Sequence, residues 1–336
     1  MFNFNQKRFE DVVDGAISLH GDIVNCVDEI CEQGYKNLFL IGVGGTYAHY
    51  LPLKYTAETL SKMEVHVEIA AEFMLMNNQH FSKDSVVVFC SRTGNTKEIV
   101  ECAKYAKERG SRVISFISHE DTPLAELSDY VFNNYADDDH LGESIYMQII
   151  PMFFRFLHNY GDFDDFSRFL KQLGEITPYL VKAKADTEDM AKALAEKHRD
   201  TDYHMVIGSG NVWGEAYDYA MCILEEMQWI KTKSIHAAEF FHGTLELVEK
   251  DTSIILLYGE DETRPLMDRA NNFVTKVSDN VAIFDTKNVE LPFDEEWRKY
   301  VSPMVIYCML ERFSCDLEHV RNHPLTTRRY YRQFEY

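Results

Sequence analysis

The stretch Asn37-Leu-Phe-Leu-Ile-Gly-Val-Gly-Gly-Thr46 joins a short apolar segment to a glycine-rich loop. Residues 37–42 are typical of a buried β-strand, and a helical pattern of apolar residues follows at 47–61. A strand, a glycine loop and a helix in this order begin a βαβ unit. The stretch therefore predicts a parallel sheet whose strands are connected by helices.

Further segments continue the alternation of strands and helices. Residues 85–90 are apolar throughout, as expected for a strand buried on both faces, and residues 65–69 alternate like a strand. Strands that alternate with helices favour a parallel sheet covered by helices on both faces. The same criteria predict strands at 112–117 and 130–132 and helices at 9–33, 97–109, 142–160 and 163–198.

The pattern begins again in the second half of the chain. The sequence Ile41-Gly-Val-Gly44 reappears as Ile207-Gly-Ser-Gly210, and Ala70-Ala-Glu-Phe73 reappears as Ala237-Ala-Glu-Phe240. The apolar strand segment 86–90 has its counterpart at 254–258. Three matches in the same order, at a nearly constant offset, indicate two copies of one αβα domain.

The repeat predicts an α/β fold of two tandem αβα sandwich domains with parallel sheets. We assign residues 1–165 to the first domain and residues 166–336 to the second. The second domain ends in a helix at about 294–320 and an arm at 322–336, which is basic and aromatic in an otherwise acidic chain.

Two loops of the first copy carry the groups that bind anions. Ser91-Arg-Thr-Gly-Asn-Thr96 offers hydroxyls, an arginine and a glycine ahead of a helix, whose first N–H groups attract negative charge. Gly44-Gly45-Thr46 follows another strand at the same predicted edge of the sheet. Such residues also make ordinary helix caps, so the convergence of two loops is the stronger evidence. The candidate substrate-binding residues here are Gly44, Gly45, Thr46, Ser91, Arg92, Thr93, Gly94, Asn95 and Thr96.

The second copy differs from the first at the matching positions. Its loop Gly259-Glu-Asp-Glu-Thr-Arg264 carries three carboxylates, which would repel a phosphate. Glu226 and His242 correspond to apolar positions of the first copy, Leu60 and approximately Leu75. A carboxylate and an imidazole can act as a general acid/base pair, although a solvated helix face and a core histidine would also explain them. The difference suggests an anion site in one copy and an acid/base pair in the other.

Composition and charge limit the classes of function. The chain has 336 residues and a formal net charge of −21, which repels nucleic-acid phosphates, so we expect no nucleic-acid partner. The N-terminus lacks a signal segment and no run of about 18 apolar residues occurs, so we expect no membrane association. Seven cysteines without a CxxC pair are typical of free thiols in a reducing compartment, and we expect a cytoplasmic protein.

These residues resemble the sugar isomerase (SIS) family along nearly the whole chain. Ser91-x-Thr-Gly-x-Thr96 is similar to the family's phosphate loop, Ser-x-Ser-Gly-x-Thr. The spacing of Glu226 and His242 matches the catalytic stretch in the isomerase half of glucosamine-6-phosphate synthase, although Ile223 stands where the synthase has a lysine. The resemblance is closer still to the fructosamine-6-phosphate deglycases, which share Glu226-Met-Gln-Trp-Ile230, Glu239-Phe-Phe-His-Gly243 and the tail segment His323-Pro-Leu-Thr-Thr-Arg-Arg-Tyr330.

The resemblance implies an enzyme that acts on an Amadori compound, an amino acid joined through nitrogen to C1 of a 2-keto sugar 6-phosphate. It implies that Glu226 is the catalytic base for a C1 proton and His242 the acid, and that an enaminol and then an aldimine form. Water would release glucose 6-phosphate and the amino acid, and no metal or other cofactor is expected. Because related enzymes share sites between subunits, we expect a homodimer or larger homo-oligomer, with the arm and Tyr336 over the substrate.

Two other functions stay open from the sequence. One is an isomerase or aminotransferase-type SIS enzyme that interconverts ketose and aldose phosphates without releasing an amine. The other is a non-catalytic sugar-phosphate sensor, which needs the phosphate loop but neither Glu226 nor His242. Such sensors usually carry a DNA-binding domain, and we expect no room for one before residue 37.

Overall fold

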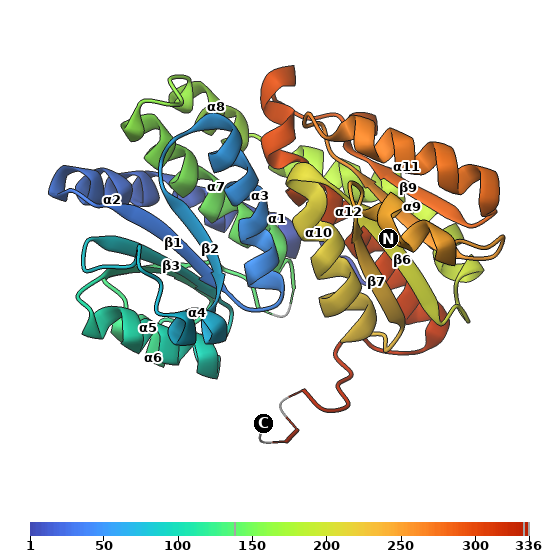
Figure 1. Ribbon diagram of the computed structural model, residues 1–336, viewed down its shortest axis with the longest axis horizontal. Helices are drawn as coiled ribbons and strands as arrows, with labels where there is room; N and C mark the ends of the chain where they lie inside the picture. The colour runs from blue at the N-terminus through green and yellow to red at the C-terminus, as the bar shows by residue number, and fades with distance from the viewer. Residues whose placement is uncertain (138, 332, 335–336) are drawn as a thin grey trace. The chain divides into compact units, whose positions relative to one another are not determined.

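The computed structural model describes residues 1–137, 139–331 and 333–334, and the chain divides into two compact units (Figure 1). The N-terminal unit comprises Asn5–Thr177 and Pro292–Asp294. The C-terminal unit comprises Pro178–Leu291 and Glu295–Tyr336, together with Met1–Phe4. A domain boundary between residues 165 and 166 stays a prediction.

The N-terminal unit is built on a five-stranded parallel sheet in the order β2-β1-β3-β4-β5. Every residue of β1 and β3 is buried, which explains why these strands are apolar at nearly every position. The strands are β1 (Asn37–Gly42), β2 (Val65–Ile69), β3 (Ser85–Ser91), β4 (Arg112–Ile117) and β5 (Tyr130–Asn133).

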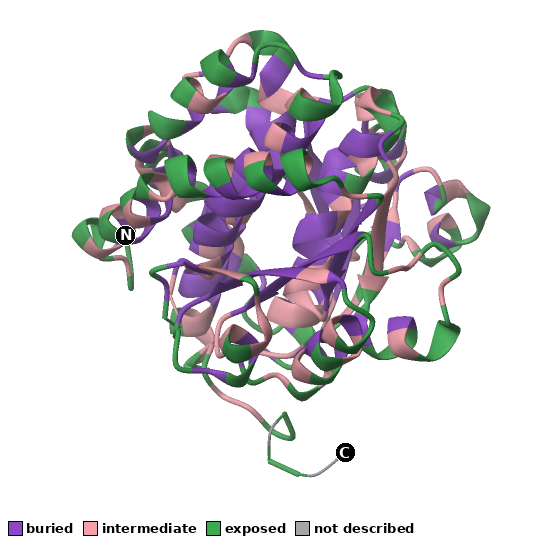
Figure 2. Ribbon diagram, turned by 90° about the vertical axis from the view of Figure 1, so that its left-hand side faces the viewer, coloured by how far each residue is buried: buried purple, intermediate pink, exposed green. Residues whose placement is uncertain are grey.

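Helices cover this sheet and supply its core. One apolar cluster joins the strands to α4, α5 and α6 through Phe73, Ile99 and Leu124, while α1, α2 and α3 pack against α7. Figure 2 shows that buried residues are concentrated in the strands and on the inward sides of the helices. The helices are α1 (Gln6–Ser18), α2 (His20–Gln33), α3 (Gly45–Leu60), α4 (Ala70–Met76), α5 (Lys97–Glu108), α6 (Pro123–Leu127), α7 (Leu141–Tyr160) and α8 (Phe166–Gly174).

The predicted helix at 9–33 is interrupted, so the prediction of one continuous helix there is wrong, whereas the predicted helical region at 163–198 consists of two helices. Residues 9–33 belong to α1 and α2, and the chain turns at Leu19, whose N–H donates to the carbonyls of Ala16 and Ile17. Residues 163–198 contain α8 and α9 (Thr177–Lys197). Gly174 favours the end of α8, and Pro178 is tolerated only because it lies in the first turn of α9.

The C-terminal unit contains a four-stranded parallel sheet in the order β7-β6-β8-β9. This order repeats β2-β1-β3-β4 of the N-terminal unit, so the predicted fold of two αβα units with parallel sheets is confirmed. The strand β7 lies at the edge and exposes Lys231, a residue type that protects sheet edges from pairing with other chains. The strands are β6 (Tyr203–Gly208), β7 (Lys231–His236), β8 (Ser253–Tyr258) and β9 (Val281–Asp285).

Helices of this unit include the long C-terminal helix, α12 (Arg298–Arg321), which was predicted at about 294–320. The guanidinium of Arg312 on α12 is fully buried and donates to the carboxylate of Glu188 (2.8 Å) and to the carbonyl of Phe2 (2.6 Å). These bonds attach the first residues of the chain to the C-terminal unit. The other helices are α9, α10 (Trp213–Asp218), a π-helix η2 (Tyr219–Glu225) and α11 (Arg264–Val277).

All seven cysteines are free thiols. Burial raises the pKa of Cys26, Cys90 and Cys102 to about 12, so these thiols stay protonated at neutral pH. Within the described part of the chain, no helix has the length and apolar character needed to cross a membrane.

Candidate active site

The first glycine loop lies between β1 and α3. Gly44 has a positive φ of 52°, a conformation that a residue with a side chain rarely adopts. The hydroxyl of Thr46 donates to the carbonyl of Val43 (3.0 Å) and accepts from the N–H of the same residue (3.1 Å). Thr46 therefore closes the turn, while α3 begins at Gly45 and presents its first N–H groups at this point.

The second loop, residues 92–96, lies between β3 and α5. Gly94 has a φ of 58°, and a Cβ atom at this position would approach the Thr122 hydroxyl to 2.2 Å, so only glycine fits. Its N–H donates to the Ser91 hydroxyl (3.2 Å), which lies 3.4 Å from the hydroxyl of Thr96. Within the described residues, Thr96 makes no side-chain capping bond to α5.

The two loops meet at one edge of the sheet, as the sequence predicted. β1 and β3 are adjacent and parallel, so their carboxyl ends, and the loops that follow them, are neighbours. The hydroxyl oxygen of Thr93 is buried and has no hydrogen-bond partner among the described residues. A buried hydroxyl without a partner is unfavourable, and a phosphate oxygen would supply one. With the N-terminal N–H groups of α5, this edge can hold a phosphate group.

The corresponding edge of the C-terminal unit holds a side chain of the protein itself. Asp261, which is only 5% exposed, accepts hydrogen bonds from the N–H groups of Asn211 (2.9 Å) and Thr263 (2.8 Å). The hydroxyl of Thr263 donates to the same carboxylate (2.6 Å). Asn211 follows β6 and Thr263 follows β8, so these N–H groups come from the counterparts of the two anion loops. A buried carboxylate thus takes the place that an anion could occupy in the N-terminal unit.

Glu226 follows directly after the π-helix η2, and its N–H donates to the carbonyl of Met221 (3.1 Å). Single turns of π-helix occur frequently at functional sites, and no sequence pattern predicted this one. The carboxylate of Glu226 forms an ion pair with the guanidinium of Arg328 (2.8 Å). The two side chains are 31% and 20% exposed, so the pair is partly shielded from water.

The C-terminal arm packs against the segment that contains Glu226. The ring of His323 lies 4.5 Å from that of Trp229, and the guanidinium of Arg329 lies 4.1 Å from the centre of the Trp229 ring. Between the arm and this segment is a cavity of about 560 Å³. It is lined by Glu225, Glu226, Trp229, Ile230, Lys231, Thr232, Arg328, Arg329, Tyr330 and Tyr331.

His242 is held at a different place in the C-terminal unit. It ends a short 3₁₀ helix, Phe240–His242, which follows β7, whereas Glu226 precedes β7. Among the described residues, those that line the Glu226 cavity do not include His242. His236, at the end of β7, packs its ring edge-to-face against Trp213, and burial lowers its pKa below the ordinary value.

The structure therefore places the predicted residues in three groups. The glycine and hydroxyl loops form one edge of the N-terminal unit, with Arg92 half-buried and Asn95 exposed. Glu226 lies in the arm cavity, and His242 lies beyond β7. Tyr336 is outside the described residues. Trp229 was not among the predicted site residues, and its place only three residues after the predicted base was the sequence signal that could have found it.

Comparison with known proteins identifies related sequences. The model of the SIS domain family matches residues 33–156. Fructosamine deglycase FrlB of Bacillus subtilis is 33% identical over 306 residues, which cover 89% of this chain and 92% of that protein. Fructoselysine 6-phosphate deglycase of Escherichia coli K12 is 23% identical over 308 residues, covering 91% and 88% of the two chains.

Solved structures agree with these matches. A Bacillus subtilis protein provisionally described as a phosphosugar isomerase superposes with a TM-score of 0.86 at 31% identity, covering 90% of this chain and 93% of that one. A Salmonella typhimurium LT2 protein with the same provisional description superposes with a TM-score of 0.85 at 28% identity, covering 94% and 99%.

Proposed function

Because the chain belongs to the SIS domain family, we propose that it is a deglycase that cleaves 6-phosphorylated Amadori compounds with water. The products are glucose 6-phosphate and a free amino acid. One observation carries the proposal: the chain is aligned almost end to end with a named fructosamine deglycase. The position of Glu226 in a cavity of the right size for a small molecule supports it.

The loops of the N-terminal unit hold the sugar phosphate. The N–H groups at the start of α5, the hydroxyls of Ser91, Thr93 and Thr96, and the turn at Gly44 favour a phosphate at this edge. Asp261 fills the corresponding edge of the C-terminal unit, so a single phosphate is bound in each chain. A fixed phosphate positions the sugar for proton transfer at C1 and C2.

Glu226 is the base of the reaction. It removes a proton from C1, and the electron pair of the C–H bond forms the C1–C2 double bond. The π bond of the C2 carbonyl breaks at the same time, and its oxygen takes up a proton, which gives an enaminol. Return of a proton at C2 and loss of the proton on nitrogen give an aldimine between C1 and the amino acid. Water adds to the aldimine carbon, and cleavage of the C1–N bond releases the amine and the aldehyde of glucose 6-phosphate. His242 moves protons on oxygen during ring opening.

Arg328 balances the charge around the base. Its guanidinium lies against the Glu226 carboxylate, and in the reaction it also offers a positive charge to the developing enaminol oxygen. The arm that carries Arg328 and Arg329 closes one side of the cavity, where the amino acid part of the substrate would lie. The free thiols and the phosphorylated substrate both agree with a cytoplasmic location, which forms part of the proposal.

The test of this function is the release of glucose 6-phosphate from 6-phosphorylated fructosyl-lysine and fructosyl-asparagine, measured with a coupled dehydrogenase. We expect release from at least one of the two and no conversion of fructose 6-phosphate alone. Turnover of fructose 6-phosphate without amine release would instead identify an isomerase. Tight binding of sugar phosphates without any turnover would identify a sensor.

Glu226 precedes β7 and His242 follows it, so the two residues lie toward opposite ends of this strand. We further propose that two copies of the chain complete each site, one copy supplying Glu226 and the other His242. The variants Glu226→Gln and His242→Asn should each be inactive alone. In a symmetric dimer, mixing them under conditions that exchange subunits should restore about a quarter of the wild-type activity, since half the dimers are mixed and hold one intact site. Exchange is verified by mass spectrometry of differently tagged subunits. No recovery in exchanged dimers would mean that one copy supplies both residues.

A further inference from the structure

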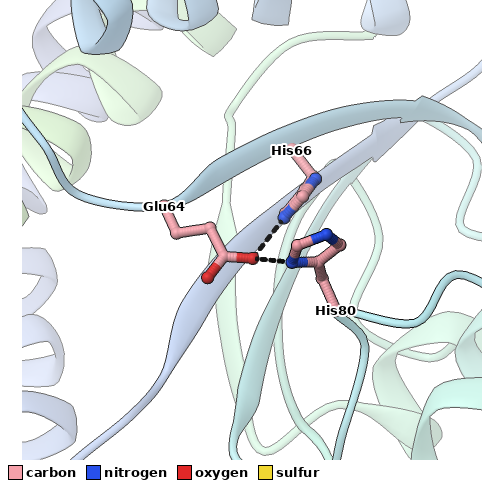
Figure 3. Close-up of side chains that lie close together, drawn as sticks. All are labelled: Glu64, His66 and His80. Atoms are coloured by element: carbon pink, nitrogen blue, oxygen red, sulfur yellow. Dashed lines mark hydrogen bonds and ion pairs between the residues drawn. The ribbon is translucent and has the colours of Figure 1, made fainter.

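Two histidines and a glutamate meet at the amino ends of the strands in the N-terminal unit (Figure 3). The Nε2 atom of His66 lies 2.8 Å from Oε1 of Glu64, and the Nδ1 atom of His80 lies 2.6 Å from the same oxygen. Both imidazole nitrogens therefore point at the same carboxylate oxygen, one from β2 and the other from the segment between α4 and β3. The three ligand atoms all lie within 4.8 Å of one another.

The fold fixes two of these three side chains. His66 is on the edge strand β2, and its ring stacks on Phe39 of β1, with 4.4 Å between the ring centres and 13° between the planes. Glu64 precedes β2, and the same oxygen accepts a hydrogen bond from the side-chain amide of Asn37 (3.1 Å). His80 comes from the segment between α4 and β3 and is 61% exposed.

We propose that Glu64, His66 and His80 form a binding site for a divalent transition-metal ion such as Zn²⁺. Two imidazole nitrogens and one carboxylate oxygen are ligands that Zn²⁺ prefers, whereas Mg²⁺ and Ca²⁺ prefer oxygen ligands alone. Asn37 and Phe39 orient the glutamate and one histidine, as residues behind metal ligands commonly do.

The spacing of the ligand atoms suits this ion after a small adjustment. Tetrahedral Zn²⁺ with bonds of about 2.0–2.1 Å separates its ligand atoms by roughly 3.3 Å. The two distances to the Glu64 oxygen, 2.8 and 2.6 Å, are somewhat shorter than this. Rotation of the exposed His80 side chain and use of the second oxygen of Glu64 can open the space without moving the sheet.

This site is separate from the proposed active site. Glu64 and His80 precede β2 and β3 and so lie at the amino ends of the parallel strands. The phosphate loops follow β1 and β3 and so lie at the carboxyl ends, on the opposite side of the sheet. A bound ion would join the segment between α4 and β3 to the edge strand β2. Its expected effect is therefore on the stability of the N-terminal unit, and glucose 6-phosphate release should not depend on it.

The experiment is calorimetric titration of ZnCl₂ into full-length protein that carries no histidine tag and has been treated with a chelator. We expect one ion per chain, and a rise in melting temperature with ZnCl₂ because the ion binds only the folded chain. His80→Asn and Glu64→Gln should each weaken binding by at least about tenfold, because each removes one of three ligands. Co²⁺ should give the visible absorption of a site with nitrogen and oxygen ligands, and this signal should be lost in both variants.

His119→Asn is the matched control, because His119 is also a half-exposed histidine of the N-terminal unit but is distant in sequence from the cluster. It should bind Zn²⁺ like the wild type. Circular dichroism establishes that each variant is folded, and His80 is exposed enough to be replaced without disturbing the core. Absence of binding by the wild type, or equal affinity in His80→Asn, Glu64→Gln and His119→Asn, would overturn the proposal.

Discussion

Glu226→Gln is expected to lower kcat for glucose 6-phosphate release by about 10²–10⁴-fold, the usual contribution of a general base. Glutamine has almost the same shape as glutamate, so it can keep a hydrogen bond to Arg328 across the 2.8 Å contact. It cannot take a proton from C1. The loss should therefore appear in kcat, with a much smaller change in KM.

Proton exchange distinguishes a base from a residue that only supports the site. In D₂O the wild type should incorporate deuterium at C1 of the bound substrate, and Glu226→Gln should not. Glu225→Gln is the matched control, because the Glu225 carboxylate accepts from the Thr232 hydroxyl (2.7 Å) and so supports the fold beside the cavity. Equal losses of kcat in the two variants, or continued exchange in Glu226→Gln, would show that the base is another residue.

Thr93→Asp is expected to raise KM by at least about tenfold, because a carboxylate about 4 Å from a phosphate costs about 1–4 kcal/mol per unit charge. The substitution copies the C-terminal unit, where Asp261 occupies the position that the repeat aligns with Thr93 and accepts two backbone N–H groups. The new carboxylate would lie among backbone N–H groups in the same way. The buried Thr93 hydroxyl has no hydrogen-bond partner among the described residues, so its loss removes no bond that the structure shows.

Thr93→Asn separates charge from size, because asparagine has the shape of aspartate without its charge. Direct titration with glucose 6-phosphate should show weak binding to Thr93→Asp and distinctly stronger binding to Thr93→Asn. The melting temperature of Thr93→Asp should stay close to that of the wild type, since the aspartate can accept the loop N–H groups as Asp261 does. Identical affinities for the two variants would contradict a phosphate at this edge.

Strands with a strong local pattern could be predicted from the sequence. β1 and β3 are apolar at nearly every position because both of their faces are buried. The glycine loops could be predicted for a related reason, since Gly44 and Gly94 adopt backbone conformations that other residues avoid. The repeat then predicted the second sheet. The position of the two anion loops at one edge followed from the parallel order of the strands.

Other parts of the fold carried too little local signal. β7 was not predicted, because an edge strand is covered on one side only and contains exposed lysines in place of an apolar run. The break between α1 and α2 at Leu19 was missed because an apolar helical pattern continues across it. In both cases, packing against neighbouring elements, rather than the residues' own preferences, decided the outcome.

By itself, the sequence determined the class of the fold, its repeat, and the chemical types of the candidate site residues. Only the tertiary structure decided which side chains meet. Glu226 is paired with Arg328 of the arm, and Asp261 accepts hydrogen bonds from backbone N–H groups of the C-terminal unit. The Glu64 carboxylate contacts two histidines. The physical reason is that backbone preferences and burial act on residues close together in the chain, so they produce periodic patterns in the sequence. Contacts between side chains that are distant in the sequence depend on how strands and loops are brought together, and no local pattern predicts them.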